Sequence, residues 1–515
     1  MKDKDNGKAT RLSRRDFLKV TGGAAALAGM GAGSLMLPGD KAHAAVIPKK
    51  WDETYDVVII GSGFAGLAAA IEAKNAGSSA LVLEKMPVPG GNSIINGGLI
   101  AAAGTPLQDK EGIKDTPDLM VKDMLKAGLG LNHPDLARTV AEQSRDTVLW
   151  TVDYLGVKYK ERVTHLGGHS VPRSYYTTES SGAGIVRPQL AKVKELGLEV
   201  RTRAYLEHIL KDEDGRVKGV KILEGYKFPK ASSGKGKLIK ARKAVVLATG
   251  GFGSDVKFRT IQDPRLTDKL DCTNQPGATA EGMMEAFRLG ATPVQVSWIQ
   301  LGPWACPDEK GMGIGYIFAI SAAFPYGLMV APETGRRFVN ELADRKVRAD
   351  AIIKTGRAAI GIADETGVKR TAMLDKMLEK GIVKKFDTLE ALAAAYNINV
   401  PGLKEEVAKY NKYLSSGTDQ EFGRPFQKDA KAVETPPFYG MRLWPKVHHT
   451  MGGIQINPKA QVIDLAGTPI AGFFAAGEVT GGVHGAVRLG SNAIADCLVL
   501  GRIAGRSAAS TDAWG

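Results

Sequence analysis

The chain has 515 residues, of which 43% are hydrophobic and 24% are charged, and its formal net charge is +14. This is the composition of a globular protein, and the length predicts two or three domains rather than one core. The basic residues are scattered and form no nucleic-acid-binding motif, so we expect no nucleic-acid partner. The cysteines, Cys272, Cys306 and Cys497, lack the spacing of a metal site or of attached haem, and we expect neither a metal nor a structural disulfide.

Residues 1–44 have the parts of an export signal. Ser13-Arg14-Arg15-Asp16-Phe17-Leu18-Lys19 precedes a Gly/Ala-rich apolar run, and Ala42-His43-Ala44 is a small-x-small cleavage site. The paired arginines are typical of the twin-arginine route, which predicts a periplasmic protein. The alternative is a membrane anchor, for which the run is only weakly apolar. Residues 1–44 hold eight Lys/Arg and four Asp/Glu, so cleavage would leave a net charge of +10, which suits an acidic substrate or redox partner.

A dinucleotide-binding unit is predicted next. Residues 55–60 form a β-branched run, 67–76 a helix and 79–85 a second strand, and the motif Gly61-x-Gly63-x-x-Gly66 lies between the first two. Such glycines let a pyrophosphate approach a helix N-terminus, and Glu84 can accept hydrogen bonds from a ribose. A purely structural glycine turn is the alternative. We assign to this site Gly61, Gly63, Ala65, Gly66, Glu84 and Lys85.

A second glycine cluster follows, Gly90-Gly91-Asn92-Ser93 with Asn96-Gly97-Gly98. Its backbone could run under a flavin ring, with the alternative of a plain loop. The cofactor candidates here are Gly91, Asn92, Ser93, Gly97 and Gly98.

The remaining pattern predicts an interrupted α/β fold. Residues 118–155 have helical periodicity, and 198–223 alternate like strands with a turn at Asp214-Gly215. Residues 244–251 read as a buried strand that ends in Gly250 and Gly251, and we assign Gly250 to the cofactor site. Residues 297–447 read mainly as loops and helices, including 389–396 and 403–414. We therefore predict a Rossmann-like FAD-binding domain, residues 50–296 and 448–515, with an inserted α+β capping domain, residues 297–447.

Three stretches resemble the flavoprotein of the fumarate reductase and succinate dehydrogenase family. They are Gly-Arg-Arg-Phe-Val-Asn-Glu at 335–341, His-His-Thr-Met-Gly-Gly at 448–453, and the glycine-rich segment 476–492. The soluble periplasmic branch, flavocytochrome c fumarate reductase and urocanate reductase, is the most similar. The resemblance implies that the C-terminal segment completes an FAD site with His449, Gly477, Glu478, Ser491 and Asn492. Gly91 matches the position of the histidine that carries covalent flavin in membrane-bound relatives, which implies non-covalent FAD.

The resemblance also implies a reaction. Hydride passes from flavin N5 to the β-carbon of an α,β-unsaturated carboxylate, and Arg345 matches the arginine that donates a proton to the α-carbon. Arg488 matches the arginine that binds the carboxylate, with His448 as its partner. The alternative for Arg345 is a surface ion pair with Asp344 or Asp350. The alternative for the histidine pair is a structural role.

The resemblance fails at one end of the substrate site. Similar fumarate reductases have a histidine shortly after Trp-Ile-Gln and a Thr-Glu pair beyond it. Here Trp298-Ile299-Gln300-Leu301 leads into Gly302-Pro303-Trp304, and residues 319–324, Ala-Ile-Ser-Ala-Ala-Phe, hold no ionisable group. A second carboxylate would be buried unpaired, so we expect a urocanate-like, aryl- or alkyl-acrylate rather than fumarate. Candidate walls are Trp304, Phe324 and Tyr326, and candidates for the proton relay are Glu341 and Asp344.

The sequence thus predicts a periplasmic FAD-dependent reductase of an unsaturated carboxylate. The chain has no haem motif, so we expect a separate cytochrome c or quinol-linked electron donor. Two alternatives stay open: a 3-ketosteroid-type flavin dehydrogenase and a non-catalytic flavin electron carrier.

Overall fold

A parallel sheet surrounds the predicted glycine motif in the computed structural model, which describes residues 47–230 and 232–515. The strands β18 (Pro469–Ala475), β8 (Lys235–Leu247), β1 (Glu53–Ile60), β2 (Ala80–Leu83) and β5 (Glu199–Arg201) lie side by side in this order and run parallel. Val57, Val58 and Ile59 are fully buried, as in a strand covered on both faces. The predicted export signal lies outside the described residues.

Antiparallel strands extend this sheet. β6 (Ala204–Lys211) and β7 (Val217–Glu224) form the predicted hairpin around Asp214-Gly215, and β7 pairs with β8. β17 (Gln461–Ile463) pairs with β18 at the other edge. Two short strand pairs, β3 (Leu99–Ala101) with β4 (Ser174–Tyr176) and β9 (Pro293–Val294) with β16 (Gly453–Ile454), complete this part of the chain.

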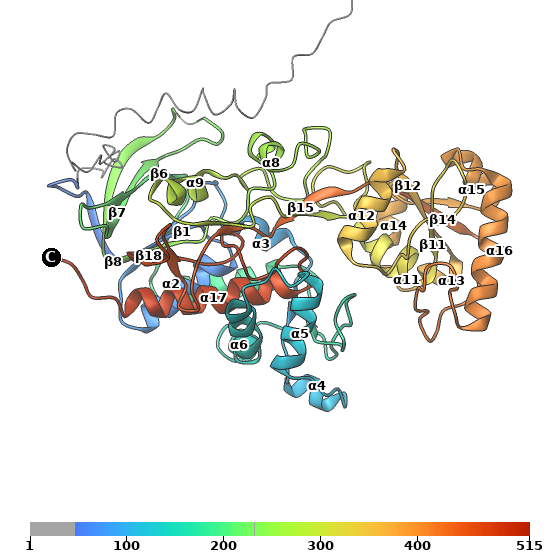
Figure 1. The fold of residues 1–515 in the computed structure, drawn as a ribbon, viewed down its shortest axis with the longest axis horizontal. Helices are drawn as coiled ribbons and strands as arrows, with labels where there is room; N and C mark the ends of the chain where they lie inside the picture. Colours follow the sequence, from blue (N-terminus) through green and yellow to red (C-terminus); the bar gives the residue numbers. More distant parts are fainter. Residues whose placement is uncertain (1–46, 231) are drawn as a thin grey trace, which may run out of the picture. The chain divides into compact units, whose positions relative to one another are not determined.

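Helices from the two ends of the described chain pack together beside the sheet. α2 (Phe64–Asn75) follows the glycine motif, and α17 (Asn492–Ala509) runs along it (Figure 1). Both contribute to one core with the buried strands. The predicted helical stretch forms two helices, α5 (Pro117–Ala127) and α6 (Pro134–Asp153). The other helices of this part are α3 (Gly91–Ile95), α4 (Pro106–Lys110), α7 (Ala183–Glu195), α8 (Val256–Gln262) and α9 (Glu281–Arg288).

The inserted segment has its own four-stranded antiparallel sheet. Its strands lie in the order β11 (Leu328–Val330), β12 (Ala359–Asp364), β14 (Phe438–Leu443) and β13 (Lys384–Phe386). Around it lie α12 (Arg345–Lys354), α13 (Glu365–Val368), α14 (Leu374–Glu379), α15 (Leu389–Tyr396) and α16 (Val400–Ser416), coloured yellow to orange in Figure 1. The helix predicted at 389–396 has these bounds, whereas the strands are short and gave no clear alternation in the sequence.

Two strands join this segment to the rest of the chain. β10 (Ile299–Gly302) pairs antiparallel with β15 (Lys446–Thr450), so the chain leaves and re-enters on neighbouring strands. Beyond β10 come three short turns, α10 (Tyr316–Phe318), the π-helix η2 (Ala319–Ala323) and α11 (Phe324–Tyr326). The predicted boundary at 297 lies just before β10, and the predicted boundary at 447 lies within β15.

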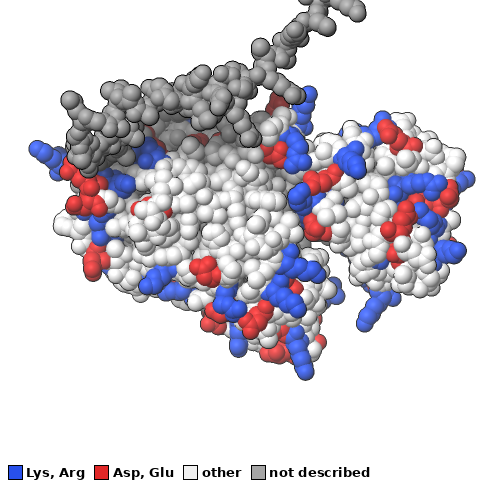
Figure 2. Space-filling view, viewed as in Figure 1, with Lys and Arg blue, Asp and Glu red and all other residues white. Residues whose placement is uncertain are grey.

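The charged surface, the cysteines and the apolar character of the helices can be compared with the expectations from the sequence. Over the face seen in Figure 2, Lys and Arg side chains are interspersed with Asp and Glu. Cys272, Cys306 and Cys497 are free thiols. Within residues 47–230 and 232–515, no helix has both the length and the apolar character needed to cross a bilayer.

Candidate active site

The glycine motif forms a tight turn between β1 and α2. Gly61 has φ +107°, and a Cβ there would lie 2.2 Å from the carbonyl oxygen of Ala248, so no side chain fits. α2 begins at Phe64, with Gly63 as its N-cap. The free N–H groups of this helix N-terminus suit a phosphate.

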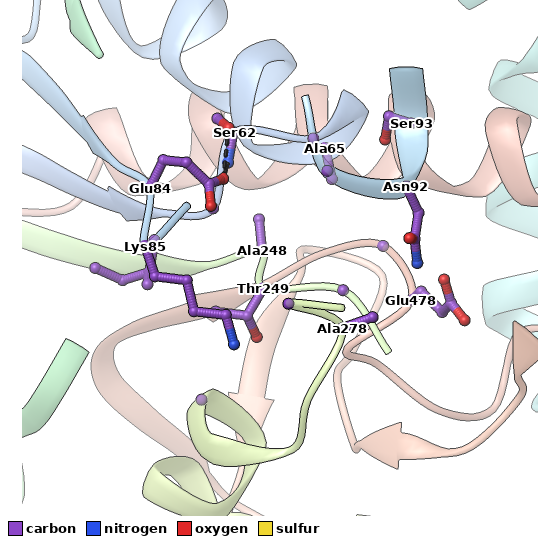
Figure 3. Close-up of a pocket in the computed structure, with 18 of the residues that line it drawn as sticks. Ser62, Ala65, Glu84, Lys85, Asn92, Ser93, Ala248, Thr249, Ala278 and Glu478 are labelled. Carbon is purple, nitrogen blue, oxygen red and sulfur yellow. Dashed lines mark hydrogen bonds between the residues drawn. The ribbon is translucent and has the colours of Figure 1, made fainter. Parts of the chain in front are cut away.

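A long cleft opens at this turn. Glu84 and Lys85 lie at one end, and Asn92, Ser93 and Glu478 lie at the other (Figure 3). The elongated shape suits a dinucleotide. The predicted cofactor residues that line it are Gly61, Gly63, Ala65, Glu84, Lys85, Gly91, Asn92, Ser93, Gly250, Gly477 and Glu478.

Hydrogen bonds to nearby residues fix the Glu84 carboxylate at one end of the cleft. One Glu84 carboxylate oxygen accepts from the Ser62 hydroxyl at 2.6 Å (Figure 3), and the other accepts from the Met86 N–H at 2.9 Å. A carboxylate has about four acceptor positions, so Glu84 can still bind a ribose diol. Lys85 Nζ lies 3.2 Å from a Glu281 carboxylate oxygen and also contacts Thr279.

Six predicted cofactor residues are not in the lining of this cleft. Gly66 packs against Gly61, and His449 contacts Glu478, which does line the cleft, at 3.2 Å. Gly97 and Gly98 lead into β3, while Ser491 and Asn492 stand at the start of α17. Asn492 is fully buried, and neither its amide oxygen nor its nitrogen has a hydrogen-bond partner. An unsatisfied buried amide is costly, which indicates that a bound group satisfies it.

The second glycine cluster does not form the plain loop that was the alternative for it. Residues Gly91–Ile95 form the one-turn helix α3. Asn92 and Ser93 still reach the cleft, and Asn92 Oδ1 accepts from the Gln275 N–H at 2.8 Å.

Several lining residues escaped the sequence analysis. They are Ser62, Tyr205, Leu206, Thr249, Gln275, Ala278, Thr279, Glu281 and Cys497. Most come from loops and strands far from any motif, where only the fold brings them together. Thr249 could have been predicted as a lining residue, because it follows a buried strand and directly precedes Gly250.

The residues present fit FAD. The turn at Gly61, the helix N-terminus after it, the carboxylate of Glu84 and the unsatisfied amide of Asn492 supply the groups that a dinucleotide with a polar ring needs.

Two predicted catalytic arginines meet at one side chain. Arg345 begins α12, and its Nη1 donates to Gln300 Oε1 at 3.0 Å. Arg488 Nη2 donates to the same oxygen at 3.2 Å, and Arg488 Nη1 donates to the Leu489 carbonyl oxygen at 2.8 Å. Gln300 in turn donates from Nε2 to the Arg488 carbonyl oxygen at 3.1 Å. The structure therefore brings together residues 300, 345 and 488, and the sequence analysis missed Gln300 as their bridge.

The electrostatics of this group favour proton donation. Burial, together with the neighbouring positive charges of Arg488 and Arg348, holds the pKa of Arg345 well below its usual value. Burial lowers the pKa of Arg488 to about 10, against the opposing effect of Glu478. Arg488 thus stays charged at neutral pH, while Arg345 is a stronger acid than a free guanidinium.

His448 faces the same group. Its Nδ1 lies 2.8 Å from the Thr273 hydroxyl, and its ring packs edge-on against Trp304 with centroids 4.9 Å apart. Burial and the charges of Arg345 and Arg488 hold the pKa of His448 well below its usual value, so the ring is neutral. A neutral imidazole beside two guanidinium groups adds hydrogen bonding without further positive charge.

Glu478 and His449 form a separate pair, in which His449 is buried and Glu478 is partly exposed toward the cleft. Glu478 accepts from the Thr450 N–H at 2.9 Å, and burial raises its pKa to about 7. His449 has a pKa well below its usual value because of burial and Arg488, and its Nε2 has no hydrogen-bond partner.

The surface ion pair suggested for Arg345 is wrong. Asp344 caps α12 by accepting from the N–H groups of Lys346 and Val347, and Asp350 pairs with Lys346. Arg345 instead points inward to Gln300.

The two relay candidates have structural contacts. Asp344 is the helix cap, and Glu341 is fully buried with its carboxylate paired to Arg337 at 2.7 Å and Arg424 at 3.2 Å. Of the candidate walls, Tyr326 instead contacts Arg370 and Asp429 on the inserted segment.

Sequence comparison places this chain in a known family. The model of the FAD binding domain family matches residues 56–494. The acrylate reductase flavoprotein subunit of Shewanella woodyi is 46% identical over 503 residues, which cover 96% of this chain and 98% of that protein. The fumarate reductase (cytochrome) of Shewanella frigidimarina is 36% identical over 465 residues, which cover 89% of this chain and 77% of that protein.

Solved structures agree. The open conformation of a flavocytochrome c3 fumarate reductase matches with a TM-score of 0.74 and 35% identity, over 89% of this chain and 78% of that one. A 3-ketosteroid-Δ4-(5α)-dehydrogenase from Rhodococcus jostii RHA1 matches with a TM-score of 0.71 and 25% identity, over 91% of this chain and 99% of that one. The chain therefore belongs to the FAD-binding domain family, among the flavoprotein oxidoreductases that include the acrylate and fumarate reductases.

Proposed function

We propose that this protein is an FAD-dependent reductase of a small α,β-unsaturated monocarboxylate of the acrylate type. The observation that carries the proposal is the pair of inward-facing arginines, Arg345 and Arg488, joined through Gln300 beside neutral His448. One guanidinium is placed to bind a carboxylate and the other to donate a proton. The 46% identity to an acrylate reductase flavoprotein subunit supports the same substrate class.

The reaction divides between the cofactor and these side chains. When bound and reduced by its electron donor, FAD would supply the hydride that the β-carbon of the acid takes up. Arg488 binds the carboxylate and stabilises the negative charge that develops on it, with His448 as a hydrogen-bonding partner. Arg345 donates the proton that the α-carbon takes up, and its lowered pKa reduces the cost of this step.

Because Asp344 caps α12 and Glu341 is paired with Arg337 and Arg424, Arg345 regains its proton from another source. A second cavity, of about 450 Å³, is lined by Gln300, whose amide oxygen accepts from Arg345, and by Asp350 and Lys346. We place the return of the proton through water in this cavity.

Fumarate fits this site less well than a monocarboxylate. The stretch 319–323 forms the π-helix η2, and its residues Ala319, Ala322 and Ala323 are fully buried. No ionisable side chain from this turn can pair with a second carboxylate, and a buried unpaired charge is expensive.

The ketosteroid alternative rests on the fold match to the Rhodococcus dehydrogenase. A ketone needs no carboxylate-binding guanidinium, whereas Arg488 is buried and aligned with Arg345 through Gln300. The same two arginines argue against a non-catalytic flavin carrier, which needs no proton donor.

FAD is held without a covalent bond. Gly91 lines the cleft, the family resemblance matches it to the histidine that carries covalent flavin in membrane-bound relatives, and glycine offers no nucleophile. Acid precipitation of the protein should release all of the yellow colour into the supernatant. Colour that stays with the pellet would contradict non-covalent binding.

The remaining proposals concern the setting of the reaction. The twin-arginine motif supports a periplasmic location. The inserted segment, residues 297–447, acts as a cap that brings Arg345 over the cofactor domain. Electrons arrive from a separate cytochrome c or quinol-linked donor, in line with the relative described as a flavoprotein subunit.

The test is dye oxidation by a panel of acids. Purified protein with reduced methyl viologen is offered acrylate, methacrylate, urocanate, cinnamate and fumarate, and a ketosteroid is offered with an artificial electron acceptor. Rapid turnover of an acrylate and slow turnover of fumarate support the proposal. Steroid oxidation with no acid reduction would overturn it in favour of a steroid dehydrogenase, and no reaction at all would favour a carrier.

A further inference from the structure

We propose that Trp304 sets the size limit of the substrate site and restricts it to short acrylates without a bulky or charged group on the β-carbon. This inference rests on the proposed function and narrows it, because the sequence left aryl- and alkyl-acrylates equally open.

The first observation is the place of the indole. Trp304 follows the end of β10 by two residues and is only 5% exposed. Its ring packs edge-on against His448, with centroids 4.9 Å apart and planes at 82°. Since the charges of Arg345 and Arg488 act on His448, the indole lies one ring away from this group, and we take it as the wall on the side of the inserted segment.

The second observation is that the indole occupies space freed by a missing side chain. Gly302 ends β10, and a Cβ there would lie 3.0 Å from both Cη2 and Cζ2 of Trp304. The six-membered part of the indole therefore lies directly against the backbone of Gly302. A side chain at position 302 would crowd the indole, so the glycine at this position leaves room for Trp304.

The indole is held in place from behind. Tyr316 packs against it with centroids 5.8 Å apart, and the buried residues Cys306, Phe318 and Ala319 belong to the same apolar cluster. The loop that carries it is fixed by the Glu309 carboxylate, which accepts from the N–H groups of Ile314 at 2.8 Å and Gly315 at 2.7 Å. Such packing makes the wall rigid, so a larger substrate cannot displace it cheaply.

The chemistry of this wall selects by size and by charge. An aryl group on the β-carbon would need the volume that the indole fills. A second carboxylate would lose its hydration against carbon atoms and gain no cationic partner from Trp304 or from Gly302. Acrylate itself has only hydrogen atoms at that end and meets neither cost.

The experiment compares substrates rather than absolute rates. The variant Trp304→Ala opens the wall, and Trp304→Phe is the matched control that keeps an aromatic ring. Each purified variant is assayed by viologen oxidation with acrylate, crotonate and cinnamate, and its FAD content and melting temperature are measured. We expect Trp304→Ala to raise the ratio of kcat/KM for cinnamate to that for acrylate at least about tenfold, since a change of one or more carbons in an apolar pocket discriminates by about 10–200-fold. Trp304→Phe should change this ratio by less than about threefold.

The outcomes separate this inference from the proposed function. A wild-type protein that reduces cinnamate as efficiently as acrylate overturns the size limit while leaving the reductase intact, and this result needs no variant to fold. A Trp304→Ala protein that reduces acrylate with bound FAD but shows an unchanged cinnamate ratio also overturns it. A wild-type protein that reduces none of the acids overturns the proposed function instead.

Discussion

At the scale of single residues, the unusual feature is a half-buried arginine whose guanidinium has an amide, rather than a carboxylate, as its neighbour. Arg345 Nη1 contacts Gln300 Oε1 at 3.0 Å, and the charges that shift its pKa are those of Arg488 and Arg348, which are also positive. An ion pair would stabilise the charged form and make proton donation harder. This environment does the opposite, so it suits an acid and is a poor choice for a merely structural cation.

Replacing this arginine should abolish turnover while leaving the cofactor bound. Arg345→Ala and Arg345→Lys are expected to lower kcat for acrylate by about 10²–10⁴-fold, the usual contribution of a general acid. Arg345 is not among the residues that line the cofactor cleft, so the flavin absorbance per protein should be unchanged. If both variants keep wild-type kcat, Arg345 is not the proton donor.

At the scale of elements, a buried loop fixes the backbone next to Arg488. His169 is 6% exposed, and its Nε2 lies 2.8 Å from the carbonyl oxygen of Gly490. Because a carbonyl oxygen only accepts, Nε2 carries the proton, and Nδ1 accepts from Arg173 Nη1 at 3.3 Å. The fully buried Arg173 is itself held by Asp115 at 2.9 Å and Asp123 at 2.8 Å.

His169→Met should therefore misplace Arg488, two residues before Gly490. We expect the KM for acrylate to rise about tenfold, the cost of one lost buried hydrogen bond, with a smaller change in kcat. His169→Gln can return a donor to the position of Nε2 and should restore most of the affinity. Equal KM values in the Met and Gln variants would show that the hydrogen bond to Gly490 does not matter.

The same histidine predicts a dependence of stability on pH. Burial lowers the pKa of His169 to about 4, against a usual value of about 6.5, so the folded protein favours the neutral ring. The contribution to the free energy of unfolding is fully present above pH 6.5 and is lost as the pH falls through 4, by at most about 3 kcal/mol. Urea unfolding at pH 7 and pH 4.5 should show a smaller loss in His169→Gln than in the wild type, and an equal loss would contradict the assignment.

At the scale of the whole molecule, the cofactor cleft draws on both ends of the described chain. Its lining runs from Ile60 to Cys497, and α17 packs along α2. A ligand held by such distant segments stabilises the folded state by linkage. Protein stripped of FAD should melt at a lower temperature, and FAD added at about 100 times its Kd should restore about 2.7 kcal/mol of stability. A melting temperature that does not respond to FAD would show that the folded protein does not bind it.

Much of this fold was predictable because its signals are local. The turn at Gly61, the strands around it and the helix at 389–396 follow from glycine placement and hydrophobic periodicity. The short strands β11–β14 were not predictable, since a strand of three or six residues gives no reliable alternation of apolar and polar side chains. In the site, the motifs pointed to Arg345 and Arg488, and Trp304 was already a candidate wall, but the bridge Gln300 depends on the pairing of β10 with β15, which spans about 145 residues of sequence.

The central claim is that the protein binds an unsaturated acid through its carboxylate and reduces the double bond. It is tested most directly by comparing acrylate with acrylamide, which has the same size and double bond but no charge, as oxidants of reduced methyl viologen. We predict that acrylate is reduced, with two electrons consumed per molecule, and that kcat/KM for acrylamide is at least about 100-fold lower, because Arg488 is left without its ionic partner. Equal rates with the two compounds, or no oxidation of the dye by acrylate, would contradict the claim.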